Sequence, residues 1–255
     1  MGQRLGQHFL INTEKLRNVA DALEIRKGDI VIEVGPGHGE LTQYLLEAGA
    51  RVTALERDKP LIEPLKKKFG EDDFEVIEGN ALELLPMVVE ELEQEGKPYM
   101  IAGNIPYYIT GFLLRTIEEL AHKPTRVVMT IQKEVAERIC AAPPQMNLLA
   151  ASVQYWATAS IVDIVPKKDF NPPPKVDSAT IRLAVHSTEG NSAEYYAFIK
   201  RLFSQPRKTI ANNLAGKEGD KEKISEMVKS AGIAPDARPH TLEIAQIERL
   251  MKLFS

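Results

Sequence analysis

The sequence predicts an α/β fold, in which helices cover a parallel β-sheet, followed by a small all-helical region at the C-terminus. Short apolar runs alternate with segments of helical periodicity, and this alternation is typical of a doubly wound parallel sheet. A glycine-rich turn follows the first strand-like run, where folds of this class bind a nucleotide-like cofactor. From Ser187 onward only helical periodicity remains. We therefore expect a sheet-containing domain at residues 1–186 and a helical domain at residues 187–255.

The strands of the parallel sheet are predicted from short β-branched and apolar runs bounded by turns. These runs are 29–34, 52–56, 74–77, 99–102 and 127–131. Amphipathic helices accompany them: one begins after Thr13, one ends near Gly49, and one begins at Asp58 with Pro60 in its first turn. The helix positions expected to face the core are Leu16, Val19, Ala20, Leu23, Leu41, Tyr44, Leu45, Ala48, Leu61, Leu65 and Phe69.

The pattern changes after Trp156, where two further strand-like runs follow each other without a helix between them. These runs, 161–165 and 180–185, predict an antiparallel hairpin at the sheet edge. The C-terminal region predicts four helices, 193–203, 207–214, 221–231 and 242–254.

Composition excludes several classes of protein. The single cysteine, Cys140, excludes a disulfide framework and a thiolate metal cluster, so we expect no metal. No apolar run is long enough to cross a bilayer, and residues 1–6 do not resemble a secretion or myristoylation signal. We expect a cytoplasmic monomer with no membrane association.

Charge is distributed unevenly along the chain. The net charge is −4, yet residues 186–255 hold 11 Lys and Arg against 9 Asp and Glu. Basic residues gather at Lys167-Lys168, Lys175, Lys200-Arg201 and Arg207-Lys208. A local basic surface can bind phosphate groups even when the total charge is negative.

The glycine-rich turn has the sequence Glu33-Val34-Gly35-Pro36-Gly37-His38-Gly39. The dinucleotide fingerprint would require glycine at position 40, where Glu40 stands, so this turn fits S-adenosylmethionine (SAM) better than a nicotinamide cofactor. A purely structural turn is the alternative. Glu56, about 20 residues beyond the glycines at the end of the second strand, can accept hydrogen bonds from both ribose hydroxyls of such a cofactor. Its alternative role is a surface carboxylate paired with Arg57.

Two asparagines end the third and fourth predicted strands. Asn80 offers an oxygen to the amino group of a cofactor adenine, and Asn104 opens the tetrapeptide Asn104-Ile105-Pro106-Tyr107. The Asn104 side-chain oxygen and the Ile105 carbonyl can accept hydrogen bonds from an exocyclic amine. Pro106 stiffens the turn, and Tyr107 offers a ring on which a flipped base can stack. An ordinary strand-to-helix turn is the alternative for this tetrapeptide taken alone.

The ordered set of motifs resembles the ribosomal RNA adenine dimethyltransferases of the KsgA family over nearly the whole chain. The matching segments are Gly6-Gln7-His8-Phe9-Leu10, Glu33-Val34-Gly35-Pro36-Gly37, Asn104-Ile105-Pro106-Tyr107, Gln132-Lys133-Glu134-Val135, Phe170-Asn171-Pro172-Pro173-Pro174-Lys175-Val176-Asp177-Ser178 and 203–214. The resemblance implies a Rossmann-like SAM-dependent methyltransferase domain with a small C-terminal helical domain.

The resemblance also implies a substrate and a set of site residues. The substrate is a pair of adjacent adenines in a hairpin near the 3′ end of small-subunit (16S) rRNA, in an immature ribosomal subunit, each dimethylated on N6. Asn104 and Ile105 would hold the amine, while Tyr107 and Phe170 would sandwich the base. The alternative for Phe170 is a loop anchor that packs on the sheet. The implied cofactor contacts are His8, Leu10, Gly35, Gly37, Glu56, Asn80 and Asn104, and the expected RNA contacts are Lys175, Arg207 and Lys208.

Three positions depart from the family pattern. His8 stands where Asn is usual, Asn80 where Asp is usual, and Pro206 where the first Arg of an Arg-Arg-Lys cluster is usual. The loss of a cation at position 206 should weaken phosphate binding and lower its salt dependence. A solvated helix start with Pro206 at the first helical position is the alternative to RNA contact by Arg207 and Lys208.

Four alternative functions remain open. A related branch dimethylates an adenine of large-subunit rRNA and confers macrolide resistance, although 203–214 and Gly6-Gln7 favour the small-subunit branch. A DNA adenine methyltransferase would need an added recognition domain. A non-catalytic assembly factor would not need Asn104 and Tyr107 intact, and a nicotinamide oxidoreductase is disfavoured by Glu40.

Overall fold

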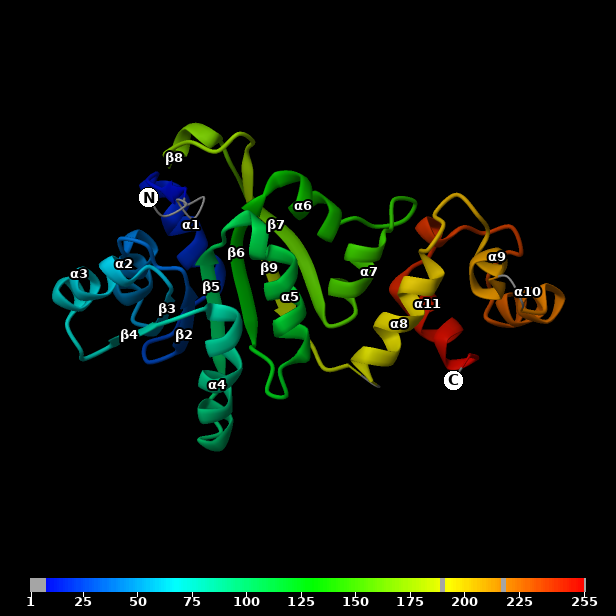
Figure 1. Ribbon diagram of the computed structural model, residues 1–255, viewed down its shortest axis with the longest axis horizontal. Helices are drawn as coiled ribbons and strands as arrows, with labels where there is room; N and C mark the ends of the chain where they lie inside the picture. Colours follow the sequence, from blue (N-terminus) through cyan, green and yellow to red (C-terminus); the bar gives the residue numbers. More distant parts are fainter. Residues whose placement is uncertain (1–7, 189–190, 217–218, 255) are drawn as a thin grey trace. The chain divides into compact units, whose positions relative to one another are not determined.

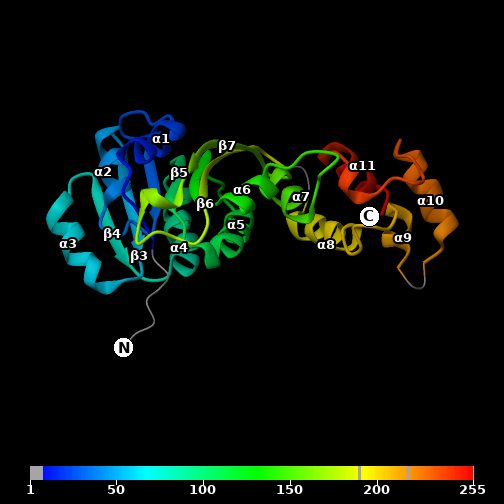
Figure 2. The same ribbon diagram turned by 90° about the horizontal axis from the view of Figure 1, so that it is seen from above.

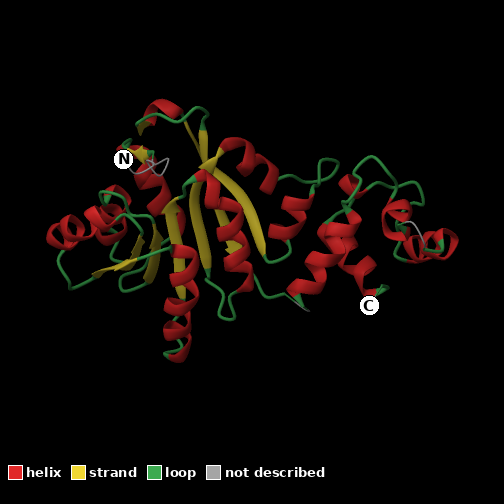
Figure 3. Ribbon diagram, in the orientation of Figure 1, coloured by secondary structure: helices red, strands yellow, loops and turns green. Residues whose placement is uncertain are grey.

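The structure is a computed structural model that describes residues 8–188, 191–216 and 219–254. Contacts divide these residues into two compact units. The sheet unit holds the residues up to Ala136 together with Thr158–His186, and the helical unit holds Glu137–Ala157 together with the residues from Ser187 onward. Figure 3 shows the strands gathered in the first unit and helices and loops from Ser187 onward.

The sheet of the first unit has seven strands in the order β4-β3-β2-β5-β6-β9-β7 (Figure 1). The strands are β2 (Ile30–Val34), β3 (Arg51–Glu56), β4 (Phe74–Glu78), β5 (Tyr99–Asn104), β6 (Arg126–Gln132), β7 (Ala157–Val165) and β9 (Ser178–Val185). β2 to β6 pair in parallel, which confirms the five strands predicted for the parallel sheet. β9 pairs antiparallel with β6, and β7 lies outside β9 at the sheet edge, where the two late strands were expected.

Helices cover both faces of this sheet, as the strand–helix alternation predicts (Figure 2). They are α1 (Thr13–Leu23), α2 (Glu40–Glu47), α3 (Lys59–Phe69), α4 (Ala81–Gln94) and α5 (Thr110–Glu119), with short 3-10 helices η1 (Tyr107–Ile109) and η2 (Lys167–Asp169). α1 and α2 contact each other on one face, and α4 and α5 contact each other on the other.

The start of α1 shows how the sequence sets a helix boundary. The Asn12 side-chain oxygen accepts hydrogen bonds from the backbone N–H groups of Glu14 and Lys15, which satisfies donors that a helix start leaves unpaired. The helix buries Leu16 and Leu23 against the sheet, as predicted from their spacing.

A second, two-stranded sheet was not predicted. β1 (Phe9–Leu10) pairs antiparallel with β8 (Phe170–Asn171), and each strand is only two residues long. Strands this short carry no periodicity, so no pattern in the sequence indicates them. His8 continues the same link between distant segments: its Nδ1 lies 2.8 Å from the carbonyl oxygen of Pro172, 164 positions later in the chain.

The helical unit contains α7 (Leu148–Gln154), α8 (Ser192–Leu202), α9 (Ile210–Ala215), α10 (Lys221–Ser230), α11 (Ile244–Lys252) and the 3-10 helix η3 (Pro239–Thr241); α6 (Lys133–Ile139) spans the division between the units. Residues 137–157 therefore differ from the expected single boundary at 186/187. The Tyr155 and Tyr195 rings stack at 3.7 Å, and the Tyr195 hydroxyl donates to the Ala151 carbonyl oxygen. The spacing of apolar residues predicts that one face of a helix is buried, but it does not predict which other helix covers that face.

One predicted helix start in this unit is wrong. The helix expected at 207–214 begins at Ile210, because the Thr209 hydroxyl accepts from the backbone N–H of Asn212 and caps α9 there. Pro206, Arg207 and Lys208 lie in the preceding turn and are exposed.

Candidate active site

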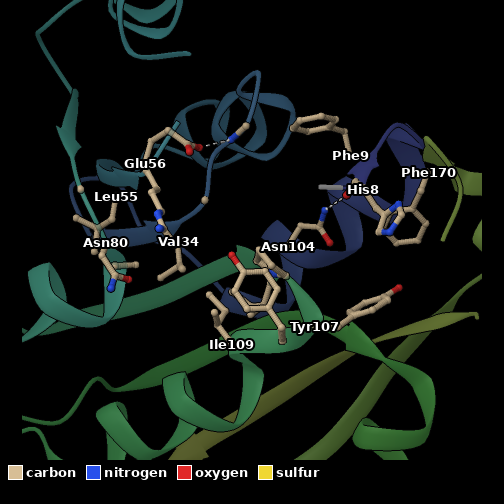
Figure 4. Close-up of a pocket in the computed structure, with 18 residues that line it drawn as sticks. His8, Phe9, Val34, Leu55, Glu56, Asn80, Asn104, Tyr107, Ile109 and Phe170 are labelled. Atoms are coloured by element: carbon tan, nitrogen blue, oxygen red, sulfur yellow. Dashed lines mark hydrogen bonds between the residues drawn. The ribbon is translucent and has the colours of Figure 1, made fainter. Parts of the chain in front are cut away.

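A cleft opens at the carboxyl ends of the parallel strands of the sheet unit and holds about 890 Å³, counting its open mouth (Figure 4). Its lining comes from the turns after β2, β3, β4 and β5 and from the β1–β8 pair. The lining residues are His8, Phe9, Val34, Gly35, Gly37, Leu55, Glu56, Arg57, Gly79, Asn80, Ala81, Asn104, Ile105, Pro106, Tyr107, Tyr108, Ile109 and Phe170. Ligands of open α/β sheets bind at this edge.

The glycine turn after β2 brings bare backbone to the cleft. Gly35 and Gly37 have backbone φ angles of +70° and +61°, which residues other than glycine rarely adopt. A Cβ at Gly37 would lie 2.8 Å from the Phe9 ring, whereas a Cβ at Gly35 would meet nothing within 4 Å. The backbone at Gly35 therefore borders open space in which ligand atoms fit, and Phe9 closes over the turn beside it.

Glu56 ends β3 with its carboxylate almost fully buried, at 4% exposure. Oε2 accepts from the Gly37 N–H at 3.2 Å, and Oε1 accepts from the Asp58 N–H at 2.7 Å. Burial raises the pKa of Glu56, and these backbone hydrogen bonds oppose that rise. The carboxylate is thus fixed against the glycine turn with lone pairs remaining for the hydroxyls of a ligand. The surface ion pair with Arg57 is not what the structure shows.

Glu33, the acid that precedes the glycines, lies beneath the cleft and does not line it. Its carboxyl group is 1% exposed, and its Oε2 accepts from the Thr42 hydroxyl on α2 at 2.6 Å. Burial raises the pKa of Glu33 to about 8, while the Thr42 hydrogen bond opposes the rise. The hydrogen bond between Glu33 and Thr42 therefore connects the end of β2 to α2, the helix that follows the glycine turn.

Asn80 lines the cleft and also caps α4. Its side-chain oxygen accepts from the Leu82 N–H at 3.2 Å, and its Nδ2 donates to Glu83 at 2.8 Å. The oxygen keeps one lone pair for a ligand, so capping and ligand binding are compatible. The bond to Glu83 requires the amide: an ionised Asp at this position would face the Glu83 carboxylate with a like charge.

Asn104 is oriented by the N-terminal strand. Its Nδ2 donates to the His8 main-chain carbonyl oxygen at 2.7 Å (Figure 4). Because a carbonyl oxygen only accepts, the amide nitrogen must face His8, which leaves Oδ1 as the atom offered to a ligand. The fold thus selects one of the two amide orientations.

Hydrogen bonds also fix Ile105 and Tyr107 of the tetrapeptide. The Ile105 N–H donates to the Thr130 carbonyl oxygen on β6 at 3.0 Å, with the Ile105 side chain buried. The Tyr107 hydroxyl lies 2.7 Å from the hydroxyl of Ser178 at the start of β9. Gly103 allows this turn to sit close to β2, since a Cβ there would lie 2.5 Å from the Val34 carbonyl oxygen. The prediction missed Gly103, although a glycine beside the motif was visible in the sequence.

Phe170 contributes to the cleft lining beside His8 (Figure 4), while most of its side chain is buried, at 3% exposure, in the hydrophobic core that also holds Leu10. Leu10, the β1 partner of Phe170, packs in the same hydrophobic core and is not among the residues that line the cleft. No sequence pattern predicted Phe9, Leu55, Tyr108 or Ile109 in the lining, because each is an apolar or aromatic residue whose neighbours only the fold determines.

The expected RNA contacts fall in different units. Lys175 is exposed on the loop that follows Phe170 in the sheet unit, whereas Arg207 and Lys208 are exposed in the helical unit. Within the described residues, no group of three or more His, Cys, Asp or Glu side chains could hold a metal ion. None of the described helices is long and apolar enough to span a membrane.

The sheet order and the cleft at its carboxyl edge define a Rossmann-like methyltransferase. The chain belongs to the ribosomal RNA adenine dimethylase family, whose family model matches residues 2–255. Similar proteins include a "Ribosomal RNA small subunit methyltransferase A" of Dehalococcoides mccartyi strain CBDB1, 39% identical over 96% of this chain and 86% of that protein. The protein of the same name from Synechococcus elongatus is 36% identical over 96% of this chain and 91% of its own length.

Two solved structures share this fold over nearly the full length. A dimethyladenosine transferase from Plasmodium falciparum superposes with a TM-score of 0.82 at 24% identity, covering 95% of this chain and 96% of its own. The 23S rRNA methyltransferase ErmE superposes with a TM-score of 0.76 at 25% identity, covering 96% of this chain and 98% of its own. The likeness to the first is evidence for the fold alone.

Proposed function

We propose that this chain transfers methyl groups from SAM to N6 of two adjacent adenines in the 3′-terminal hairpin of small-subunit rRNA. The orientation of Asn104 supports the proposal most directly, because a fixed acceptor oxygen at the cleft is what an exocyclic amine requires. The substrate branch rests on the relatives of 33–39% identity that carry the small-subunit name.

The proposed cofactor site combines the glycine turn with Glu56 and Asn80. The bare backbone at Gly35 accommodates close approach, and the Glu56 carboxylate accepts from the ribose hydroxyls. The free lone pair of Asn80 accepts from the adenine amino group. When bound, SAM supplies an electrophilic methyl group on a sulfonium.

In the proposed mechanism the chain acts by alignment. Asn104 Oδ1 and the Ile105 carbonyl accept hydrogen bonds from the two N–H groups of the adenine amine. These hydrogen bonds favour the pyramidal geometry that frees the lone pair of the amine nitrogen. Tyr107 and Phe170 hold the ring between them. Alignment accounts for most of the rate in such a transfer, and the methylated amine, transiently cationic, can lose its proton to water.

The proposed substrate contacts extend beyond the cleft. Lys175, Arg207 and Lys208 would bind phosphates of the hairpin, which makes the helical unit an RNA-contact domain. We further propose that the protein acts as a cytoplasmic monomer on an immature subunit.

The testing experiment supplies purified protein and methyl-labelled SAM to small subunits from a strain that lacks the modification. We expect label in dimethyladenosine of the small-subunit RNA. Large-subunit RNA and DNA serve as parallel substrates, because ErmE, at 25% identity, is named for 23S rRNA. Label confined to either of these would overturn the small-subunit assignment.

A further inference from the structure

We propose that Tyr108 and Phe112 form an aromatic platform beside the cleft, on which the nucleotide next to the reacting adenine stacks. The inference rests on the proposed function, since it assigns the position of the second base in the same RNA. Tyr108 is 55% exposed and Phe112 is 68% exposed.

The two rings lie on one face of a continuous helical segment. The 3-10 helix Tyr107–Ile109 runs directly into α5, and both Ile109 and Thr110 have right-handed helical backbone conformations. Residues four apart on a helix are neighbours one turn apart, so Phe112 follows Tyr108 along the same face. The opposite face packs into the core through Leu113, Leu114 and Ile117, which directs the first face outward.

A glycine stands between the two aromatic residues in the sequence. Gly111 is exposed, and a Cβ added to it would meet nothing within 4 Å. No side chain at this position stands between Tyr108 and Phe112, so a flat base can approach both. Stacking on aromatic side chains tolerates any base, because every base presents a π-face.

The platform adjoins the cleft at its Tyr108 end, and near its Phe112 end the charge of Arg115 is neutralised by ion pairs. Tyr108 lines the cleft together with Asn104 and Tyr107. Arg115, the next charged residue on α5, forms ion pairs with Glu118 and Glu119. This neutralised end favours an uncharged base over a phosphate group, and the shared wall at Tyr108 places that base next to the adenine in the cleft.

The test uses small subunits reconstituted with unmethylated RNA that carries 2-aminopurine on either side of the target adenine, and the variants Phe112→Ala and Phe112→Leu. With wild-type protein we expect stacking to quench the fluorescence at one of the two positions. Both variants should lose this quenching, and both should raise KM about tenfold with little change in kcat, since Leu keeps the apolar surface and removes the ring.

Two controls isolate the contribution of the platform to RNA binding. Met87→Ala removes a side chain that is 61% exposed on α4 and lies outside the cleft lining, and it should leave KM and quenching unchanged. RNA with an abasic neighbour should show equal KM for wild type and Phe112→Ala.

Three outcomes would contradict the platform. Unchanged KM and quenching in both Phe112 variants would overturn it while leaving the proposed function standing. A KM defect that persists with the abasic RNA, or a change in sedimentation that shows Phe112 at an interface between copies, would overturn it as well. Wild-type protein that transfers no methyl group to unmethylated small subunits would refute the proposed function itself.

Discussion

The Nδ2 atom of Asn104 donates a 2.7 Å hydrogen bond to the main-chain carbonyl oxygen of His8, 96 residues earlier in the chain. His8 immediately precedes β1, and β1 pairs with the strand that carries Phe170. The segment that orients the amine acceptor is therefore continuous with the segment that positions the stacking ring. Displacing either should disturb both, which links base stacking to amine alignment.

Replacing Asn104 should separate chemistry from folding. Asn104→Ala removes the acceptor, and we expect methyl transfer to fall at least about a hundredfold, as when one positioned polar group of an active site is removed. Asn104→Asp should be equally impaired, because a carboxylate cannot donate to the His8 carbonyl. Asn18→Ala, which removes a hydrogen bond to Asp163 far along the chain, should keep full transfer. Single-turnover rates and melting curves measure both effects; near-normal transfer by Asn104→Ala would remove its proposed role.

Replacing Glu56 by Gln should weaken cofactor binding although the side chain keeps its shape. Each carboxylate oxygen accepts from a backbone N–H, so the amide NH2 of Gln must face one of these two donors. We expect at least a tenfold rise in the Kd for SAM by calorimetry and a lower melting temperature. Glu63→Gln, an exposed carboxylate on α3, is the matched control and should change neither value. Unaltered SAM affinity in Glu56→Gln would argue against the ribose contact.

A pair of glycine substitutions should distinguish backbone strain from loss of the turn. Gly37→Ala and Gly96→Ala place Cβ atoms at similar φ values, +61° and +64°. Gly96→Ala should lower the free energy of unfolding by about 1 kcal/mol, and Gly37→Ala should lower it further. Only at Gly37 would the Cβ collide with a neighbour, the Phe9 ring at 2.8 Å. Gly37→Ala alone should also weaken SAM binding. Equal SAM affinity in the two variants would contradict the importance of the close packing at Phe9.

Stability should depend on the ionisation of Glu33. Its pKa in the folded protein is raised to about 8 from an ordinary value of 4.5, so the folded state retains the proton over this range while the unfolded state loses it. The free energy of unfolding should therefore decrease as pH rises from about 4.5 to about 8, by a few kcal/mol in order of magnitude. Glu33→Gln should lose this component of the pH dependence.

Urea unfolding at a series of pH values measures the effect, and Thr42→Val provides a second check. The Thr42 hydrogen bond holds the pKa of Glu33 down, so its removal should extend the decline in stability to higher pH. A Glu33→Gln protein with the same pH profile as wild type would show that another group is responsible.

The basic turn before α9 should contribute to RNA affinity through counterion release. Each cation that contacts a phosphate contributes about 0.7–0.9 to the slope of log affinity against log salt concentration. We expect Arg207→Gln and Lys208→Gln each to lower the slope by about that amount, measured by filter binding. Lys229→Gln, exposed in the last turn of α10, should leave the slope unchanged. If all three variants lower it equally, binding by this turn is not specific.

Much of the sheet unit followed from local pattern. The runs that became β2 to β6 are apolar because both faces of a parallel sheet are buried, and this burial is visible in the residues themselves. The α9 start was misplaced because Pro206 is compatible with both a turn and a first helical residue, whereas the Thr209 cap decides between them. Residues 137–157 were assigned to the first domain since sequence proximity was the only guide to their packing partner.

By itself the sequence determined the parallel sheet, the glycine turn and the asparagines at strand ends, because these depend on side-chain type and spacing along one segment. Only the tertiary structure decided how Asn104 is turned, that Leu10 packs into the core, and that Phe9 and Tyr108 line the cleft. Those features depend on contacts between distant segments, β1 with β8 and His8 with Asn104, and β1 and β8 are too short to leave a periodic signal.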